Sequence, residues 1–171
     1  MYIILSQIIK TKYSLECPDD DFCLKQSILD CLSFLRINDD YSCCDGSYLF
    51  CNVDILLKMD RNKVHPDWKN NIEINNLFSK KNKIFHSLVK KDFRSDDPLE
   101  RIMFDFRNWI TKQHSVLKTE ASKKAFEILS YNENLRPVCF QEYIHSAVMM
   151  AFGNSKKLCR PHSIRSITDR M

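Results

Sequence analysis

The predicted fold follows from one stretch, Pro137-Val-Cys-Phe-Gln-Glu-Tyr-Ile-His-Ser-Ala-Val-Met-Met-Ala-Phe-Gly153. Pro137 suits the first turn of a helix because its missing N–H would be unpaired there, and Gly153 tolerates the backbone conformation that ends a helix. The residues between them are apolar around most of the helix circumference. Such a helix is normally the central one of a bundle. We therefore predict a buried helix at about 137–153, surrounded by the rest of the chain.

Helical patterns precede this stretch along most of the chain. Apolar residues recur at helical spacing in residues 22–37, 48–60, 72–89, 98–110 and 119–129, whereas residues 1–13 fit either a helix or a strand. Residues 41–47 are predicted to be an internal loop, with Asp45-Gly46 as its turn. The whole pattern predicts an all-α fold. It would be a single compact bundle of six to seven helices over residues 1–153, followed by a basic, flexible tail at 154–171.

The composition narrows the class of protein. A chain of 171 residues is long enough for one domain with a sizeable core. It contains only two glycines, which disfavours β-rich folds and excludes Gly-rich phosphate loops and the G-x-S-x-G elbow. No run reaches the ~18 apolar residues that span a bilayer, and the first ten residues lack the layout of a signal peptide. We expect a cytoplasmic protein, with a nuclear one, or a secreted one that has lost its signal, as the alternatives.

Charge is distributed unevenly along the chain. Residues 16–60 carry ten acidic and three basic side chains, whereas residues 61–94 carry nine basic and three acidic ones. Six basic side chains of the second segment are candidates for phosphate contacts: Lys80, Lys81, Lys83, Lys90, Lys91 and Arg94. No aromatic side chain alternates with the lysines for base stacking. A solvated helix face is therefore favoured, and nucleic-acid binding through residues 80–94 and the tail is an alternative.

Eight cysteines allow three interpretations. Six lie in the first third of the chain: Cys17, Cys23, Cys31, Cys43, Cys44 and Cys51. Their spacing lacks the closely spaced pairs typical of structural zinc, and reduced thiols are favoured over disulfides inside a cell. Glu142 and His145 have the E-x-x-H spacing of di-iron bundles, but no second such pair occurs. We expect no metal, no cofactor and no catalytic residues.

Two segments resemble known helical families. The sequence Asp19-Asp-Asp-Phe-Cys-Leu-Lys-Gln-Ser-Ile-Leu-Asp-Cys-Leu32 resembles the first long helix of small poxvirus-type Bcl-2-like proteins. Those proteins are cytoplasmic bundles that bind host death or signalling proteins through a groove. Of the Asn-Trp-Gly-Arg groove motif, only Asn108-Trp109 is present. Residues 124–129 with 139–148 are similar in layout to the last two helices of class II helical cytokines, which are secreted and disulfide-linked.

These observations lead to an expected function. We expect a non-enzymatic intracellular protein that binds another protein, and the first resemblance implies a viral modulator of host signalling or apoptosis. The alternatives are a secreted helical cytokine and a nucleic-acid-binding protein. Aromatic side chains dominate interface energetics, so the candidates for contact with a partner are Trp68, Phe104 and Trp109. The sequence predicts neither the identity of the partner nor the oligomeric state.

Overall fold

The computed structural model describes residues 7–17, 21–52, 92–108, 112, 114–131 and 138–167. Within them, four helices accompany a five-stranded mixed sheet, so the predicted all-α bundle of six to seven helices is wrong. The helices are α2 (Lys25–Ile37), α5 (Pro98–Asn108), α6 (Thr119–Ser130) and α7 (Val138–Phe152). The strands are β1 (Tyr13–Leu15), β2 (Phe22–Cys23), β3 (Tyr41–Asn52), β4 (Val116–Lys118) and β5 (Asn154–Ile167).

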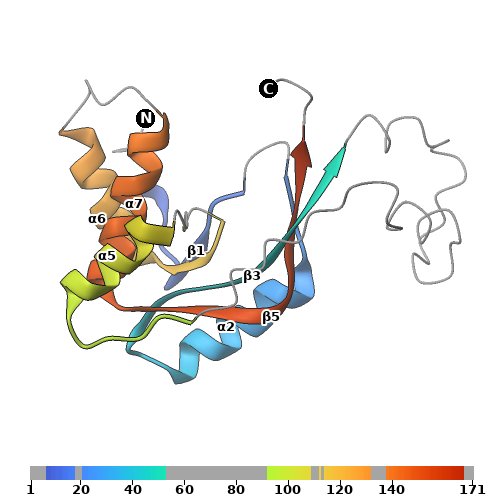
Figure 1. Cartoon of the computed structure of the whole chain (residues 1–171), viewed down its shortest axis with the longest axis horizontal. Helices are drawn as coiled ribbons and strands as arrows, with labels where there is room; N and C mark the ends of the chain where they lie inside the picture. Colours follow the sequence, from blue (N-terminus) through green and yellow to red (C-terminus); the bar gives the residue numbers. More distant parts are fainter. Residues whose placement is uncertain are drawn as a thin grey trace, which may run out of the picture.

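The sheet curls into a half-barrel with the strand order β1-β4-β3-β5-β2. Its two longest strands, β3 and β5, run parallel and side by side, and the other pairs are antiparallel (Figure 1). The register between β3 and β5 shifts at three places between Tyr41 and Tyr48. Such irregularities bend a strand and increase its twist, which is consistent with the curl of the sheet.

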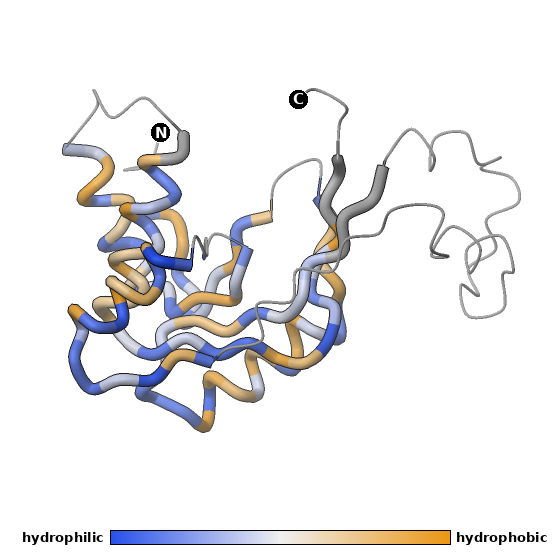
Figure 2. The backbone as a smooth tube through the Cα atoms, in the orientation of Figure 1, coloured by the Kyte–Doolittle hydropathy of each residue, from blue (hydrophilic) through white to orange (hydrophobic). Residues whose placement is uncertain are grey.

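Helices cover both faces of the sheet. Adjacent residues on a strand point to opposite faces, so Cys44 packs with Cys31 of α2, whereas Cys43 packs with Met149 of α7. The same alternation holds on β4, where Val116 belongs to the first cluster and Leu117 to the second. Figure 1 shows α2 apart from the group formed by α5, α6 and α7. Apolar and polar residues alternate along α2 in Figure 2, as expected for a helix with one face on a sheet.

The predicted loop at 41–47 is instead part of β3, and its glycine has a steric role. A Cβ atom on Gly46 would lie 2.3 Å from the carbonyl oxygen of Arg160, on β5. Likewise, a Cβ atom on Gly153 would lie 2.8 Å from the carbonyl oxygen of Asp40. Gly46 therefore allows the backbone of β3 to lie close to that of β5. Gly153, the residue before β5, likewise lies close to Asp40, the residue before β3. Residues 48–52, predicted to be helical, also belong to β3.

Residues 154–167, predicted to be a flexible tail, form strand β5. This strand lies between β3 and β2, and its side chains His162 and Ser163 are fully buried. Its basic residues find acidic partners: Lys156 pairs with Asp92, and Arg160 pairs with Asp30. Residues 154–167 are thus an interior strand of the sheet.

The helices predicted near 98–110, 119–129 and 137–153 are present as α5, α6 and α7. However, α7 is only partly enclosed. His145 and Met149 are buried, whereas Phe140 and Phe152 are about half exposed. The predicted helix at 72–89 lies outside the described residues. Among the helices that are described, none has the length and apolar character that crossing a bilayer requires.

Candidate functional site

Helix α5 has its polar side chains inside and its apolar stripe outside. Arg101 is 7% exposed and Asp105 is 3% exposed, whereas the exposed fractions of Leu99, Met103 and Phe106 are 63%, 42% and 45%. The three apolar residues follow one another at i, i+4 and i+7, so they lie along one side of the helix. A buried polar residue or an exposed apolar patch indicates a special role more strongly than a buried apolar or an exposed polar residue does. Both occur in this one helix.

Arg101 explains why α5 can turn its polar face inward. Its Nε donates a hydrogen bond to the carbonyl oxygen of Met150 at 2.6 Å, and Nη2 donates to that of Ala151 at 3.0 Å. Its Nη1 donates to the carbonyl oxygen of Ser95 at 2.6 Å. The last carbonyl groups of a helix lack intrahelical partners, so a guanidinium at the end of α7 satisfies them and complements the helix dipole.

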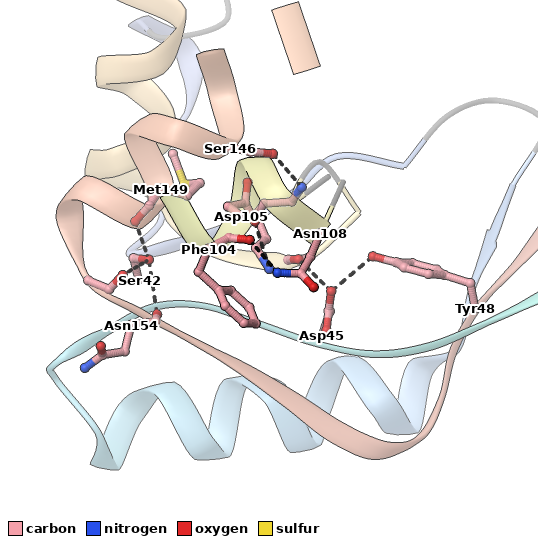
Figure 3. Close-up of polar contacts among 12 residues, drawn as sticks. Ser42, Asp45, Tyr48, Phe104, Asp105, Asn108, Ser146, Met149 and Asn154 are labelled. Carbon is pink, nitrogen blue, oxygen red and sulfur yellow. Dashed lines mark hydrogen bonds and ion pairs between the residues drawn. The ribbon is translucent and has the colours of Figure 1, made fainter. Parts of the chain in front are cut away.

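Asp105 forms the second buried contact of α5. Its carboxylate lies 3.5 Å from Nζ of Lys112, and both side chains are almost completely buried. The backbone N–H of Lys112 donates to Oγ of Ser146 on α7 at 2.9 Å (Figure 3). Burial raises the pKa of Asp105 to about 6, although the ammonium group of Lys112 opposes this shift. The pair therefore ties α5 and α7 together at the cost of desolvating two charges.

Polar contacts also hold α7 to the sheet. Ser42, near the start of β3, donates to the carbonyl oxygen of Met149 on α7 at 2.6 Å. Within the sheet, the carboxylate of Asp45 on β3 accepts hydrogen bonds from the hydroxyl groups of Tyr48 at 3.1 Å and Ser115 at 3.2 Å (Figure 3). Helix α7 is thus joined to β3 by a buried hydrogen bond, and α5 is joined to α7 by Arg101.

The outer surface of these helices is continuous. The ring of Phe106 stacks on the ring of Tyr143 at a centroid distance of 5.6 Å and an interplanar angle of 13°. Because Arg101 reaches Met150 and Phe106 reaches Tyr143, α5 and α7 run antiparallel. We call this surface the α5–α7 face. Its members are Leu99, Met103, Phe106, Phe140 and Tyr143.

A separate buried cluster combines thiols with a histidine. Nδ1 of His162 lies 3.0 Å from Oγ of Ser27 and 4.0 Å from Sγ of Cys31, and Nε2 donates to the carbonyl oxygen of His114 at 2.7 Å. A hydrogen bond from Cys44, opposed by burial and assisted by His162, lowers the pKa of Cys31 to about 6. Cys31 has no exposed surface through which a substrate would reach it.

The described parts of the chain contain no group of three or more histidine, cysteine or carboxylate side chains that would hold a metal ion. Six of the cysteines are free thiols: Cys17, Cys23, Cys31, Cys43, Cys44 and Cys159.

The contact residues predicted from the sequence are only partly described. Phe104 is half-buried and stacks on Phe93 at 4.1 Å, so it supports α5 from the inside. Arg94 is exposed and pairs with Asp40 at 3.5 Å. The stacked rings bring the segment that contains Arg94 against α5. The other predicted residues lie outside the described residues: Trp68, Trp109, Lys80, Lys81, Lys83, Lys90 and Lys91.

The sequence analysis did not predict the α5–α7 face as a candidate surface. Its apolar residues on α5 read as an ordinary core stripe. The available signal was Arg101 and Asp105, which are four residues apart and so share a helix face. That spacing is equally typical of an exposed ion pair on a solvated face. The sequence alone therefore does not show whether Arg101 and Asp105 face the interior or the solvent.

Comparison with protein-family models and with curated proteins found no match for this chain. Its function is therefore inferred from its own geometry.

Proposed function

We propose that this protein is a non-enzymatic protein-binding domain and that the α5–α7 face is its contact surface. The observation that carries the proposal is the reversed orientation of α5. Three large apolar side chains point to solvent while Arg101 and Asp105 occupy the interior. Fully burying an exposed apolar side chain of this size contributes about 1.5–3 kcal/mol, and a partner that covers the face gains roughly half of that from each of these partly buried side chains.

The chemistry of the face fits a protein partner. Phenylalanine, tyrosine and methionine are enriched at the centres of interfaces, and methionine adapts its shape to different partners. The backbones of α5 and α7 are held by their buried contacts, and Phe106 stacks on Tyr143, which lowers the entropic cost of binding.

Charges at the ends of α5 indicate the kind of partner. Asp96, Asp97 and Glu100 lie exposed at the N-terminal end of the helix, and Arg107 lies exposed at the other end. A partner helix that places a basic side chain near the acidic end and an acidic one near Arg107 would complement this pattern. We therefore propose an amphipathic helix of another protein as the partner, with its apolar stripe on Met103 and its basic end at Glu100.

The fold does not match either of the two helical families that parts of the sequence resemble. Both the Bcl-2-like and the cytokine resemblance imply an all-helical bundle, which the sheet rules out as the fold of this chain. The proposal of protein binding is therefore independent of those families.

Site-specific photocrosslinking tests the contact surface. A photoreactive phenylalanine analogue replaces Met103 in the full chain, and a matched variant carries it at Lys124, which is exposed on α6. We expect a discrete covalent adduct with another protein from position 103, in several-fold excess over position 124. Adding Phe106→Asp to the first variant should reduce the adduct at least about 10-fold, because a central aromatic contact typically contributes 2 kcal/mol or more.

Equal labelling from positions 103 and 124 would contradict the proposed surface. An adduct with the mass of two chains would identify a second copy as the partner, and would leave the surface correct but the partner wrong.

A further inference from the structure

Two cysteines lie at the edge strands of the curled sheet. Cys17 follows β1 by two residues, and Cys23 belongs to β2. In the strand order, β1 and β2 are the first and last strands of the sheet. The Sγ atoms of Cys17 and Cys23 are 3.4 Å apart, at the two ends of the short connection from β1 to β2. The two thiols therefore meet across this connection.

The connection that carries these cysteines is anchored at both of its ends. Oε1 of Glu16 lies 3.3 Å from Nε2 of His145 on α7, and Oδ2 of the buried Asp21 lies 3.7 Å from Nδ1 of His114. The backbone N–H of Leu24 donates to the carbonyl oxygen of His162 at 2.8 Å. These contacts hold the two sulfur atoms in place before any bond forms between them.

We propose that Cys17 and Cys23 are a thiol–disulfide site, and that a low-molecular-weight disulfide such as glutathione disulfide converts them into an intramolecular disulfide that joins β1 to β2. The proposal does not depend on the α5–α7 face. It differs from a lone reactive cysteine because two sulfur atoms from opposite edges of the sheet are already in contact.

The reaction balances as two thiol–disulfide exchanges. The sulfur of Cys17 attacks the reagent, which forms a mixed disulfide and releases one reduced thiol. The sulfur of Cys23 then attacks the sulfur of Cys17, which forms the internal disulfide and releases the second reduced thiol. The two protons lost by the cysteines end on the released thiols, and the two electrons end in the reduced reagent.

The order of the two steps follows from exposure and acidity. Cys17 is exposed, whereas Cys23 is half-buried. Burial, together with the hydrogen bond to Cys17, raises the pKa of Cys23 to about 12. The exposed Cys17 therefore meets the reagent first. The mixed disulfide removes the Cys17 thiol, and with it the part of the pKa rise that Cys17 causes, so Cys23 can lose its proton and attack the mixed disulfide.

The disulfide would stabilise the pairing of β2 with the rest of the sheet; we call this effect the clasp. Strand β2 is only two residues long and pairs with β5 through Phe22 and Cys23. Such a short edge strand opens easily. A covalent bond to the residues after β1 closes a short loop, and the chain-entropy model then predicts a melting temperature higher by roughly 5 °C or more.

Intact mass spectrometry on the reduced full-length chain tests this site with glutathione disulfide as the probe. We expect the wild type to lose two hydrogen atoms from the peptides that contain Cys17 and Cys23, with the cross-link mapped to these two residues. Cys23→Ser should stop at a glutathione adduct on Cys17. Cys159→Ser removes an exposed cysteine on β5 that forms its own glutathione adduct, and it should keep the cross-link between Cys17 and Cys23. In reductant, all variants should melt within a few degrees of one another, which checks that they fold.

Hydrogen exchange supplies the second readout. Oxidation should slow exchange of the amide of Leu24 and raise the melting temperature in the wild type and Cys159→Ser only. Accumulation of glutathione on Cys17 in the wild type, without the internal bond, would overturn the thiol–disulfide site. An internal bond that changes neither amide exchange nor melting temperature would overturn the clasp.

Discussion

At the scale of single residues, two buried carboxylates are each held by specific polar partners. Asp105 is paired with Lys112, and Asp45 is hydrogen-bonded to Tyr48 and Ser115. The sequence indicates a turn at Asp45 because Asp-Gly pairs favour turns. Its true partners include Ser115, 70 residues away in the chain. A contact of this kind leaves no periodic signal, so a buried carboxylate cannot be distinguished from one in a turn by local pattern.

The Asp105–Lys112 pair predicts a pH dependence of stability. The pKa of Asp105 is about 6 in the folded protein, above its ordinary value of 3.8. Between about pH 4 and pH 6, the folded state therefore holds a proton that the unfolded chain has released. The free energy of unfolding should fall as the pH rises across this window, by about 2–3 kcal/mol from this group. Asp105→Asn should lack this component.

Urea unfolding of the wild type and Asp105→Asn at several pH values from 4 to 7 measures the difference. The exposed Asp96→Asn is the matched control, and its difference from the wild type should stay flat over the same range. If the wild type instead gained stability over Asp105→Asn as the pH rose, attraction to Lys112 would exceed the cost of burial, and the assignment would be wrong.

At the scale of secondary-structure elements, the sequence predicted where α5, α6 and α7 lie along the chain better than which side of each helix faces the interior. Asp97 accepts a hydrogen bond from the backbone N–H of Leu99 at 2.8 Å, so the predicted start of α5 is confirmed by its cap. On α6, Ala121, Ala125 and Leu129 are buried, as their spacing predicts. On α5, the apolar stripe faces solvent, because the inward position is taken by hydrogen bonds to the end of α7. Caps are local, whereas orientation depends on a distant partner.

The reversed orientation of α5 predicts effects of very different size for two neighbouring substitutions. Arg101→Met leaves three carbonyl groups without their donor and should lower the free energy of unfolding by about 2–4 kcal/mol. Met103→Gln changes an exposed side chain and should alter it by less than about 0.5 kcal/mol. Urea unfolding of both variants beside the wild type compares them directly. Comparable losses in the two variants would mean that the apolar stripe of α5 is inside.

At the scale of the whole molecule, the sheet depends on contacts between the two ends of the sequence. Tyr41 pairs with Asn154, and Asn52 pairs with Ile167. The polar composition of residues 154–167 predicts a solvated tail when it is considered alone. In the structure, Gly46 allows β3 and β5 to approach, and Asp30 and Asp92 neutralise Arg160 and Lys156. Each of these conditions lies far away in the sequence, so windows of local periodicity identified the helices but missed the sheet.

Removal of β5 tests this dependence on the whole chain. A chain that ends at Gly153 loses the strand that pairs with β3 from Tyr41 to Asn52 and with β2. It also exposes the interior of the half-barrel, where the buried His162 and Ser163 side chains lay. We expect it to lose cooperative unfolding in urea and the near-ultraviolet circular dichroism of packed aromatic rings. A chain that ends at Ile167 keeps β5 and serves as the control. If the chain that ends at Gly153 unfolded as cooperatively as the wild type, the helices would fold without the sheet. That result would contradict the importance of the pairing between β3 and β5.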